Sequence, residues 1–292
     1  MLLCPDCHTP MPGSGPTDCT NCAWQAEELE GVPVLLPTAD RESPAFQAYT
    51  ANYDRIAEDD LRESIQPMRY LDVQAETLLS YVRPVSGLRV CELGIGRGLL
   101  FDRLLAAGPK SLSGIDISLA YLRRYVSRAN ESDGSLRLAL ANAESLSYAE
   151  EFDLVVASEI LEHVLNVGDF LISLHRSLVP GGRVLVRVPY KEDLRQYARQ
   201  NGCEYPYVHL RTFTRDSLVS MMGSAGFRPG RVYYDGQFGA RPRRLTGPFF
   251  PWLKPYLRRL LDADGIPIAS TRGVVPRLLL QPVTLTAFFT RR

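Results

Sequence analysis

The sequence contains no long hydrophobic run. No stretch approaches the roughly 18 consecutive apolar residues of a membrane-spanning helix. The N-terminus, M-L-L-C-P-D-C, also lacks the basic stretch and following apolar segment that mark a signal peptide. We therefore expect a cytoplasmic protein. With 292 residues, 45% of them apolar, the chain has room for one large domain and a small one.

An excess of charge of one sign is also missing, because the formal net charge is zero. The charge is nevertheless unevenly distributed: residues 1–80 carry 4 basic and 14 acidic side chains, whereas residues 228–292 carry 12 and 3. Two interpretations of the basic C-terminal region stay open. It is either ordinary solvated surface, or a face that contacts something anionic, which would place the protein at the periphery of a membrane.

Four of the six cysteines are confined to the first 22 residues, in two C-x-x-C pairs. Two such pairs can converge on one tetrahedral zinc ion, and a site of four thiolates has no open position for a substrate. A disulfide framework would need an oxidising compartment. We therefore expect a structural zinc site formed by Cys4, Cys7, Cys19 and Cys22. Residues 1–37 then form a zinc-ribbon-like module that depends on the metal for its stability.

The next segment is polar and then helical. Residues 38–85 are interpreted as a linker and helical lid, with helices over 45–60 and 68–82. Tyr49 and Tyr53 belong either to this lid or to ordinary core packing. From residue 86 to 292, short apolar strands alternate with helical stretches, which predicts an α/β fold with a mostly parallel, doubly wound sheet. The strands are expected at 88–93, 111–116, 136–140, 153–157, 183–188, 229–234 and 283–289, and the helices at 98–107, 118–129, 167–178 and 214–225.

The first of these strands ends in V-C-E-L-G-I-G-R-G, residues 90–98. Glycines at this position let a ligand approach the main chain. The spacing is not the G-x-G-x-x-G of a dinucleotide loop, because Leu99 occupies the third expected position. Glu92 would repel a pyrophosphate, yet it suits a ligand that carries an ammonium group.

The segment E-L-G-I-G-R-G resembles the first motif of the class I S-adenosylmethionine-dependent methyltransferases. Further segments resemble the later motifs of this family in the correct order: G-I-D-I-S at 114–118, A-N-A-E-S-L at 141–146, F-D-L-V-V-A-S-E-I-L-E-H-V at 152–164 and L-V-P-G-G-R-V-L-V-R-V-P at 178–189. The resemblance implies a seven-stranded sheet and a cofactor site. It places the cofactor against Glu92, Gly94, Gly96, Gly98, Asp116, Ile117, Asn142, Ala143 and Ser158. Asp116 would accept hydrogen bonds from the ribose hydroxyls, and Asn142 stands where the family usually has Asp.

A hydroxyl acceptor would gain from a general base. The candidates are Glu159, Glu162 and His163, just after the strand expected at 153–157, and His209 in H-L-R-T-F-T. Each could equally be structural: His163 by closing a helical turn, His209 by orienting a loop. Arg211 is either a ligand for an anionic acceptor group or part of an internal salt bridge.

An insertion of about 50 residues, at 236–281, separates the last two strands. Its mixture of aromatic, apolar and basic residues suits a pocket cap or a homodimer contact better than a membrane interface, because its prolines interrupt any helix. Three functions remain open: methylation of a small molecule, sugar or lipid-linked acceptor; methylation of RNA, less favoured because the zinc module is acidic; and a non-catalytic zinc-ribbon interaction protein that binds the cofactor.

Overall fold

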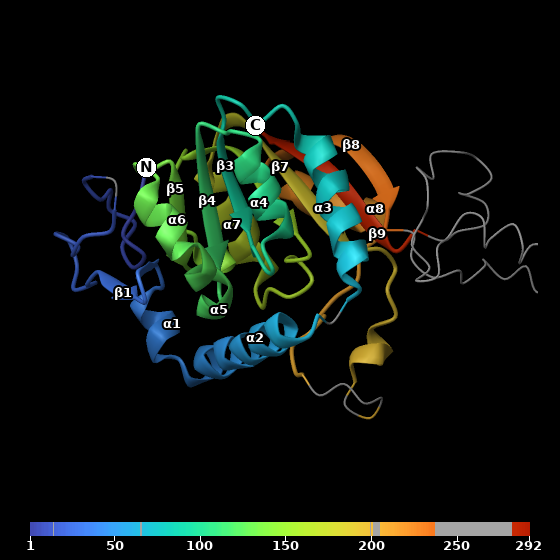
Figure 1. The fold of residues 1–292 in the computed structure, drawn as a ribbon, viewed down its shortest axis with the longest axis horizontal. Helices are drawn as coiled ribbons and strands as arrows, with labels where there is room; N and C mark the ends of the chain where they lie inside the picture. Colours follow the sequence, from blue (N-terminus) through green and yellow to red (C-terminus); the bar gives the residue numbers. More distant parts are fainter. Residues whose placement is uncertain (14, 65, 199, 201–204, 237–281) are drawn as a thin grey trace, which may run out of the picture.

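A computed structural model describes residues 1–13, 15–64, 66–198, 200, 205–236 and 282–292. Its centre is a nine-stranded sheet in the order β1-β2-β5-β4-β3-β6-β7-β9-β8 (Figure 1). The strands from β5 to β7 are parallel, and β9 and β8 follow as antiparallel strands. The strands are β1 (Glu27–Leu29), β2 (Val32–Val34), β3 (Arg89–Leu93), β4 (Ser111–Asp116), β5 (Leu136–Leu140), β6 (Phe152–Ser158), β7 (Leu178–Pro189), β8 (Phe227–Asp235) and β9 (Thr284–Arg291).

Helices pack on both sides of this sheet, as the alternating sequence pattern predicts. They are α1 (Thr38–Glu42), α2 (Pro44–Arg62), α3 (Met68–Val82), α4 (Leu99–Ala106), α5 (Leu119–Leu122), α6 (Val126–Glu131), α7 (Val167–Ser177) and α8 (Arg215–Ser224), with short 3-10 turns η1 (Arg123–Tyr125), η2 (Ala143–Ser145) and η3 (Leu194–Tyr197). Helix α2 begins with Ser43 as its N-cap and Pro44 in its first turn, which is the arrangement that favours a helix start.

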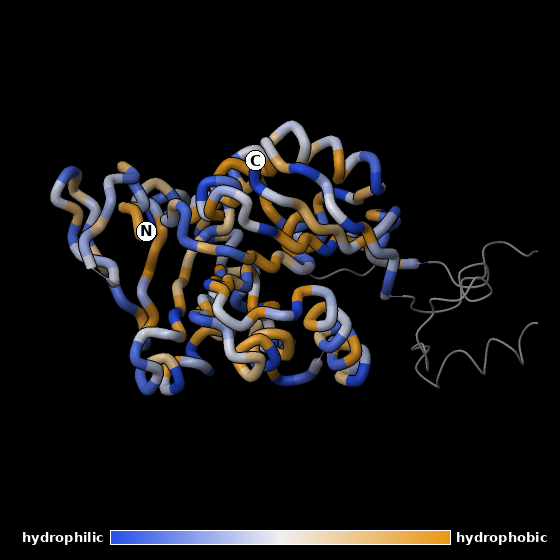
Figure 2. Tube along the Cα trace, turned by 90° about the horizontal axis from the view of Figure 1, so that it is seen from above, coloured by the Kyte–Doolittle hydropathy of each residue, from blue (hydrophilic) through white to orange (hydrophobic). Residues whose placement is uncertain are grey.

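Two hydrophobic cores lie on opposite faces of the sheet. Along β6, Leu154 and Val156 point to the core beneath α3 and α4, whereas Val155 and Ala157 point to the core beneath α7 and α8. Buried parallel strands are apolar on both faces for this reason. In Figure 2, hydrophobic residues recur along the interior segments of the chain, and hydrophilic residues are frequent in its outermost turns.

The N-terminal ribbon is joined to the same sheet. Val34 of β2 pairs in parallel with Leu140 of β5, and the Leu35 amide donates to the Leu140 carbonyl at 2.8 Å. The ribbon also contributes Trp24, only 2% exposed, to the core beneath α7. The sheet thus contains the seven predicted strands, β3 to β9, and the two strands of the ribbon, β1 and β2, extend it at the β5 edge.

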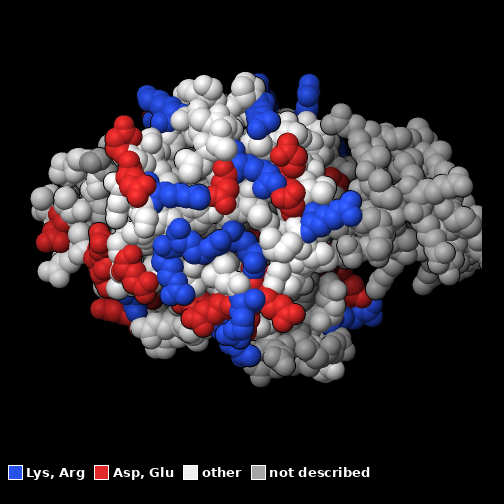
Figure 3. Space-filling model, viewed as in Figure 1, with Lys and Arg blue, Asp and Glu red and all other residues white. Residues whose placement is uncertain are grey.

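One part of the sequence prediction lies outside the described residues: positions 237–281 of the expected insertion, with all of its aromatic and basic residues. Within the described part of the chain, no helix combines the length and the apolar character that a bilayer crossing requires. On the face seen in Figure 3, acidic and basic side chains are interspersed.

Candidate active site

A cavity of about 310 Å³ lies where the parallel strands end, between these strand ends and α2. Figure 1 shows α2 running across this edge of the sheet. The cavity is lined from the strand side by seven of the residues predicted to bind the cofactor, namely Gly94, Gly96, Asp116, Ile117, Asn142, Ala143 and Ser158, and from α2 by Tyr49, Tyr53 and Ile56. The two tyrosines thus cover the cavity, as a lid would.

The glycine loop connects β3 to α4 through three residues with positive φ: 69° at Gly94, 50° at Gly96 and 79° at Gly98. A methyl group at Gly94 or Gly98 would collide with Ile160 or with the Tyr125 hydroxyl. A methyl group at Gly96 meets no protein atom within 4 Å. Gly98 does not line the cavity but provides the turn into α4, whereas Gly96 leaves room there for a ligand.

Asp116 is held at the end of β4 with its carboxylate beside the loop. Its Oδ1 accepts from the Ser118 amide at 2.9 Å and its Oδ2 from the Gly96 amide at 3.2 Å. Burial raises the pKa of Asp116 to about 6, against the effect of these hydrogen bonds. Glu92 does not line the cavity. Its side chain is buried behind the loop, and desolvation, reinforced by Asp116, raises the pKa of Glu92 well above its usual value.

Two of the predicted catalytic residues, Glu159 and His163, line the cavity at the β6 end. The Nδ1 atom of His163 lies 3.0 Å from the Tyr53 hydroxyl and also contacts the Val208 carbonyl. Because the Tyr53 hydroxyl donates to the Tyr207 carbonyl at 2.9 Å, we assign the ring proton to Nδ1, which leaves Nε2 with a free lone pair. Burial, with smaller contributions from His209 and Arg211, lowers the pKa of His163 to about 3. The imidazole is therefore neutral at physiological pH.

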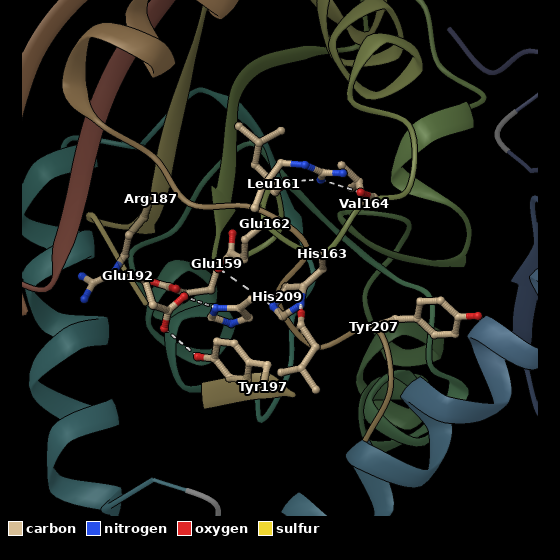
Figure 4. A network of polar contacts seen from close by, with 12 residues as sticks. Glu159, Leu161, Glu162, His163, Val164, Arg187, Glu192, Tyr197, Tyr207 and His209 are labelled. Atoms are coloured by element: carbon tan, nitrogen blue, oxygen red, sulfur yellow. Dashed lines mark hydrogen bonds and ion pairs between the residues drawn. The ribbon is translucent and has the colours of Figure 1, made fainter. Parts of the chain in front are cut away.

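The third predicted catalytic residue, His209, packs against His163 with ring centroids 4.7 Å apart. Its Nδ1 lies 2.5 Å from Oε2 of Glu192, whose Oε1 accepts from the Tyr197 hydroxyl at 2.6 Å (Figure 4). A carboxylate on Nδ1 makes Nε2 the basic atom of the ring. Sequence reasoning missed Glu192, because it lies 17 residues from His209 in a different loop.

Glu162 and Glu159 complete this polar network (Figure 4). Glu162 is fully buried, and desolvation together with Glu159 raises the pKa of Glu162 well above its usual value. Glu159 forms an ion pair of 3.0 Å with Arg187, which is buried on β7.

Arg211 donates to the Leu161 carbonyl at 2.9 Å and to that of Val164. In this structure Arg211 therefore supports the turn that carries His163, rather than pairing with an acid.

The described residues contain two clusters of potential metal ligands. The first is the predicted zinc site, Cys4, Cys7, Cys19 and Cys22, whose sulfur atoms all lie within 4.8 Å of one another. The Cys4–Cys22 and Cys7–Cys19 pairs are each 3.5 Å apart, and these cysteines are free thiols. Tetrahedral zinc with Zn–S bonds of about 2.3 Å requires sulfur separations of about 3.8 Å. The cluster thus fits a structural zinc ion.

The second cluster is Glu162, His163 and His209, whose donor atoms also lie within 4.8 Å of one another. Imidazole nitrogens and a carboxylate are suitable ligands for a divalent cation. The same atoms are the candidates for proton transfer. The geometry therefore permits two ways of activating an acceptor beside the cavity.

Comparison with known proteins places this site in a family. A family model described as "Methyltransferase domain" matches residues 45–230. The ubiquinone biosynthesis O-methyltransferase of Caulobacter sp. (strain K31) is 30% identical over 192 residues, which are 62% of this chain and 76% of the relative. That of Thiobacillus denitrificans is 27% identical over 207 residues, 70% of this chain and 83% of the relative. For the Azorhizobium caulinodans enzyme, 31% identical, the chain spans only 61% of the relative.

Solved structures agree on the fold. A Haloferax volcanii structure, described as a complex between the Trm112 methyltransferase activator and a putative methyltransferase, has a TM-score of 0.55 at 16% identity and covers 83% of this chain and 96% of that chain. The Burkholderia thailandensis 1,6-didemethyltoxoflavin-N1-methyltransferase, solved with 1,6-didemethyltoxoflavin and S-adenosylhomocysteine, has a TM-score of 0.51 at 16% identity, covering 85% of this chain and 90% of that chain. The fold is that of class I S-adenosylmethionine-dependent methyltransferases. The chain belongs to the methyltransferase-domain family.

Proposed function

We propose that the protein transfers the methyl group of S-adenosylmethionine to a hydroxyl oxygen of a small molecule. One observation carries this proposal: a cavity built by the predicted cofactor residues is continuous with the wall formed by Glu159 and His163, against which the Glu192–His209 pair packs. The ubiquinone biosynthesis O-methyltransferases among the relatives support oxygen as the acceptor atom.

The donor is bound along the strand ends. The backbone at Gly96 provides the space for close approach, and the Asp116 carboxylate accepts from the ribose hydroxyls. Tyr49 and Tyr53 cover the cavity from α2 and exclude water. The methyl group is already activated by the sulfonium, so orientation is the main task, and this can contribute roughly 7–11 kcal/mol.

The acceptor is activated at the β6 end. The acceptor hydroxyl gives its proton to Nε2 of His209 as its oxygen forms a bond to the methyl carbon, while the S–CH₃ bond breaks and leaves a neutral thioether. Glu192 holds the proton on Nδ1 of His209 and stabilises the imidazolium that forms. His163 stays neutral and gives the acceptor side a polar wall.

Substitution of the proposed general base, His209, tests this mechanism. In His209→Asn we expect kcat to fall by about 10²–10⁴-fold, the usual contribution of a general base, with donor affinity unchanged. Glu192→Gln should lower kcat in the same direction. His175→Asn is the matched control, since His175 packs on Phe227 in the core behind the sheet. Turnover is measured as S-adenosylhomocysteine release with panels of phenols, sugars and lipid-linked hydroxyl compounds. Full activity of His209→Asn would refute its role as base.

A divalent cation held by Glu162, His163 and His209 is the second candidate for acceptor activation, because their donor atoms converge. Such an ion would lower the pKa of a bound hydroxyl. Metal content distinguishes the two mechanisms, because chelation would also remove a zinc ion from the four-cysteine site. With a base alone, active enzyme holds only the zinc ion of the four cysteines, whereas with a metal it holds a second divalent ion, which Glu162→Gln should lose together with activity while the zinc ion stays.

A further inference from the structure

The side chain of Asn142 is oriented by a residue from outside the methyltransferase sheet. Its Nδ2 donates to Oδ2 of Asp40 at 3.0 Å, and its Oδ1 accepts from the Glu144 amide at 3.0 Å. Asn142 is 7% exposed and lines the cavity. A carboxylate only accepts hydrogen bonds and an amide N–H only donates. Exchanging the amide oxygen and nitrogen would therefore break both contacts, so Asp40 and the Glu144 amide together fix the direction in which the carbonyl of Asn142 points.

The position of Asn142 in the cavity suggests which part of the donor it meets. The sheet order β5-β4-β3-β6 places Asn142, Asp116, Gly94 and Ser158 along one row of strand ends. If Asp116 holds the ribose of S-adenosylmethionine, the adenine ring and the methionine part of the donor lie on opposite sides of Asp116. The acceptor groups, Glu159 and His163, lie at the β6 end. The adenine ring therefore lies at the β5 end, beside Asn142.

Asp40 also changes how strongly Asn142 can bind an amino group. A neutral amide oxygen is a weaker acceptor than a carboxylate. The contact with Asp40, however, places a negative charge behind the amide, and hydrogen bonds in a chain polarise one another. We propose that Asp40 is a positioning residue that makes the Asn142 carbonyl a directed, strengthened acceptor for the exocyclic amino group of adenine. This inference rests on the proposed use of S-adenosylmethionine.

The ribbon holds Asp40 in this place. Asp6, which lies between Cys4 and Cys7, accepts from both the amide and the hydroxyl of Thr38, each at 2.7 Å, at the start of α1. Arg41, next to Asp40, pairs with Glu27 of β1 at 2.8 Å. The short helix α1 is thereby tied to the zinc module at both of its ends. The ribbon thus contributes to the donor site through Asp40, although none of its cysteines lines the cavity.

The test compares two ligands that differ at the amino group. Calorimetry gives the dissociation constants of S-adenosylhomocysteine and of S-inosylhomocysteine, in which a carbonyl replaces the amino group. Wild-type protein should prefer the adenosyl compound. In Asp40→Ala this preference should fall about ten-fold, the effect of losing one charge-assisted hydrogen bond. Glu42→Ala, which removes an exposed acid from the same helix, should leave it unchanged.

A swap of the pair separates positioning from a general effect on folding. Asn142→Asp alone sets two carboxylates against each other and should lower the melting temperature. In the double variant Asp40→Asn/Asn142→Asp, the new amide donates to the new carboxylate, and the adenosyl preference should return. An unchanged preference in folded Asp40→Ala, or no recovery in the double variant, overturns the inference. If wild-type protein binds neither compound, the proposed function itself fails.

Discussion

At the scale of single residues, Asp116 makes donor binding depend on pH. In the proposed donor complex its ionised carboxylate accepts from both ribose hydroxyls, and burial raises the pKa of Asp116 to about 6 in the ligand-free protein. We expect donor affinity to be constant above this value and to fall by up to ten-fold per pH unit below it. Calorimetry of S-adenosylhomocysteine between pH 4.5 and 8 measures this. Asp116→Asn should bind about 10–100-fold more weakly and lose this component of the pH dependence.

The same residue affects stability in the opposite direction. Because the raised pKa means that the folded chain holds this proton more tightly than the unfolded chain, the contribution of Asp116 to stability falls as pH rises through 4–6. The free energy of unfolding of the ligand-free protein, compared with Asp116→Asn, should show this sign. Affinity and stability that change together with pH would contradict this assignment.

The residues that sequence reasoning found and those that it missed differ in one physical respect. Asp116 is the last residue of β4, and Gly96 and Asn142 lie within three residues after β3 and β5, so a local pattern predicts where they lie. Glu192 and Asp40 reach the site from distant segments, and only tertiary packing brings them to His209 and Asn142. No local periodicity encodes such a contact.

At the scale of elements, the turn from β3 into α4 needs its glycines for two different reasons: Gly98 for contact with the protein, and Gly96 for space in the cavity. Gly98→Ala must move the Tyr125 hydroxyl, which lies 1.8 Å from the added methyl group, whereas Gly96→Ala meets no protein atom. Both substitutions also incur the cost of a left-handed conformation, about 1–2 kcal/mol. We expect Gly98→Ala to lower the free energy of unfolding more, and Gly96→Ala to weaken donor binding more relative to its loss of stability.

Denaturant unfolding and calorimetry on the same samples measure both quantities. Gly98→Ala should cost less stability in a Tyr125→Ala background than in the wild-type protein, because the clashing hydroxyl is gone. Equal losses of stability in the two glycine variants would indicate that backbone conformation alone decides, and that the Tyr125 contact has no role.

The helices and strands themselves were largely predictable, and the pairing of the sheet edge was not. Apolar runs and their alternation with helical patterns indicate β3 to β9, and the observed bounds of α3 and β4 equal the predicted ones. Strand β2 has only three residues, and its pairing with β5 depends on the ribbon fold as a whole. A sequence pattern therefore predicts the ribbon but not its place in the sheet.

At the scale of the whole molecule, we propose a division into 1–37, 38–85 and 86–292, in which the first segment serves the others. Trp24 joins the core behind the sheet, β2 extends the sheet, and Asp6 caps the helix that carries Asp40. Loss of the metal should therefore lower the stability of the whole protein and weaken donor binding at the cavity.

Cys19→Ser tests this coupling without touching the cavity. Wild-type protein should contain about one zinc ion per chain, as a four-cysteine site requires, and the variant should contain much less. Trp252→Phe leaves Trp24, 2% exposed, as the sole tryptophan. In that background Cys19→Ser should shift the fluorescence to longer wavelength, lower the melting temperature by several degrees and weaken S-adenosylhomocysteine binding. Because the ribbon supports Asp40, the loss of affinity should be smaller in an Asp40→Ala background, whereas equal losses in both backgrounds would show that the metal acts on the cavity by another route.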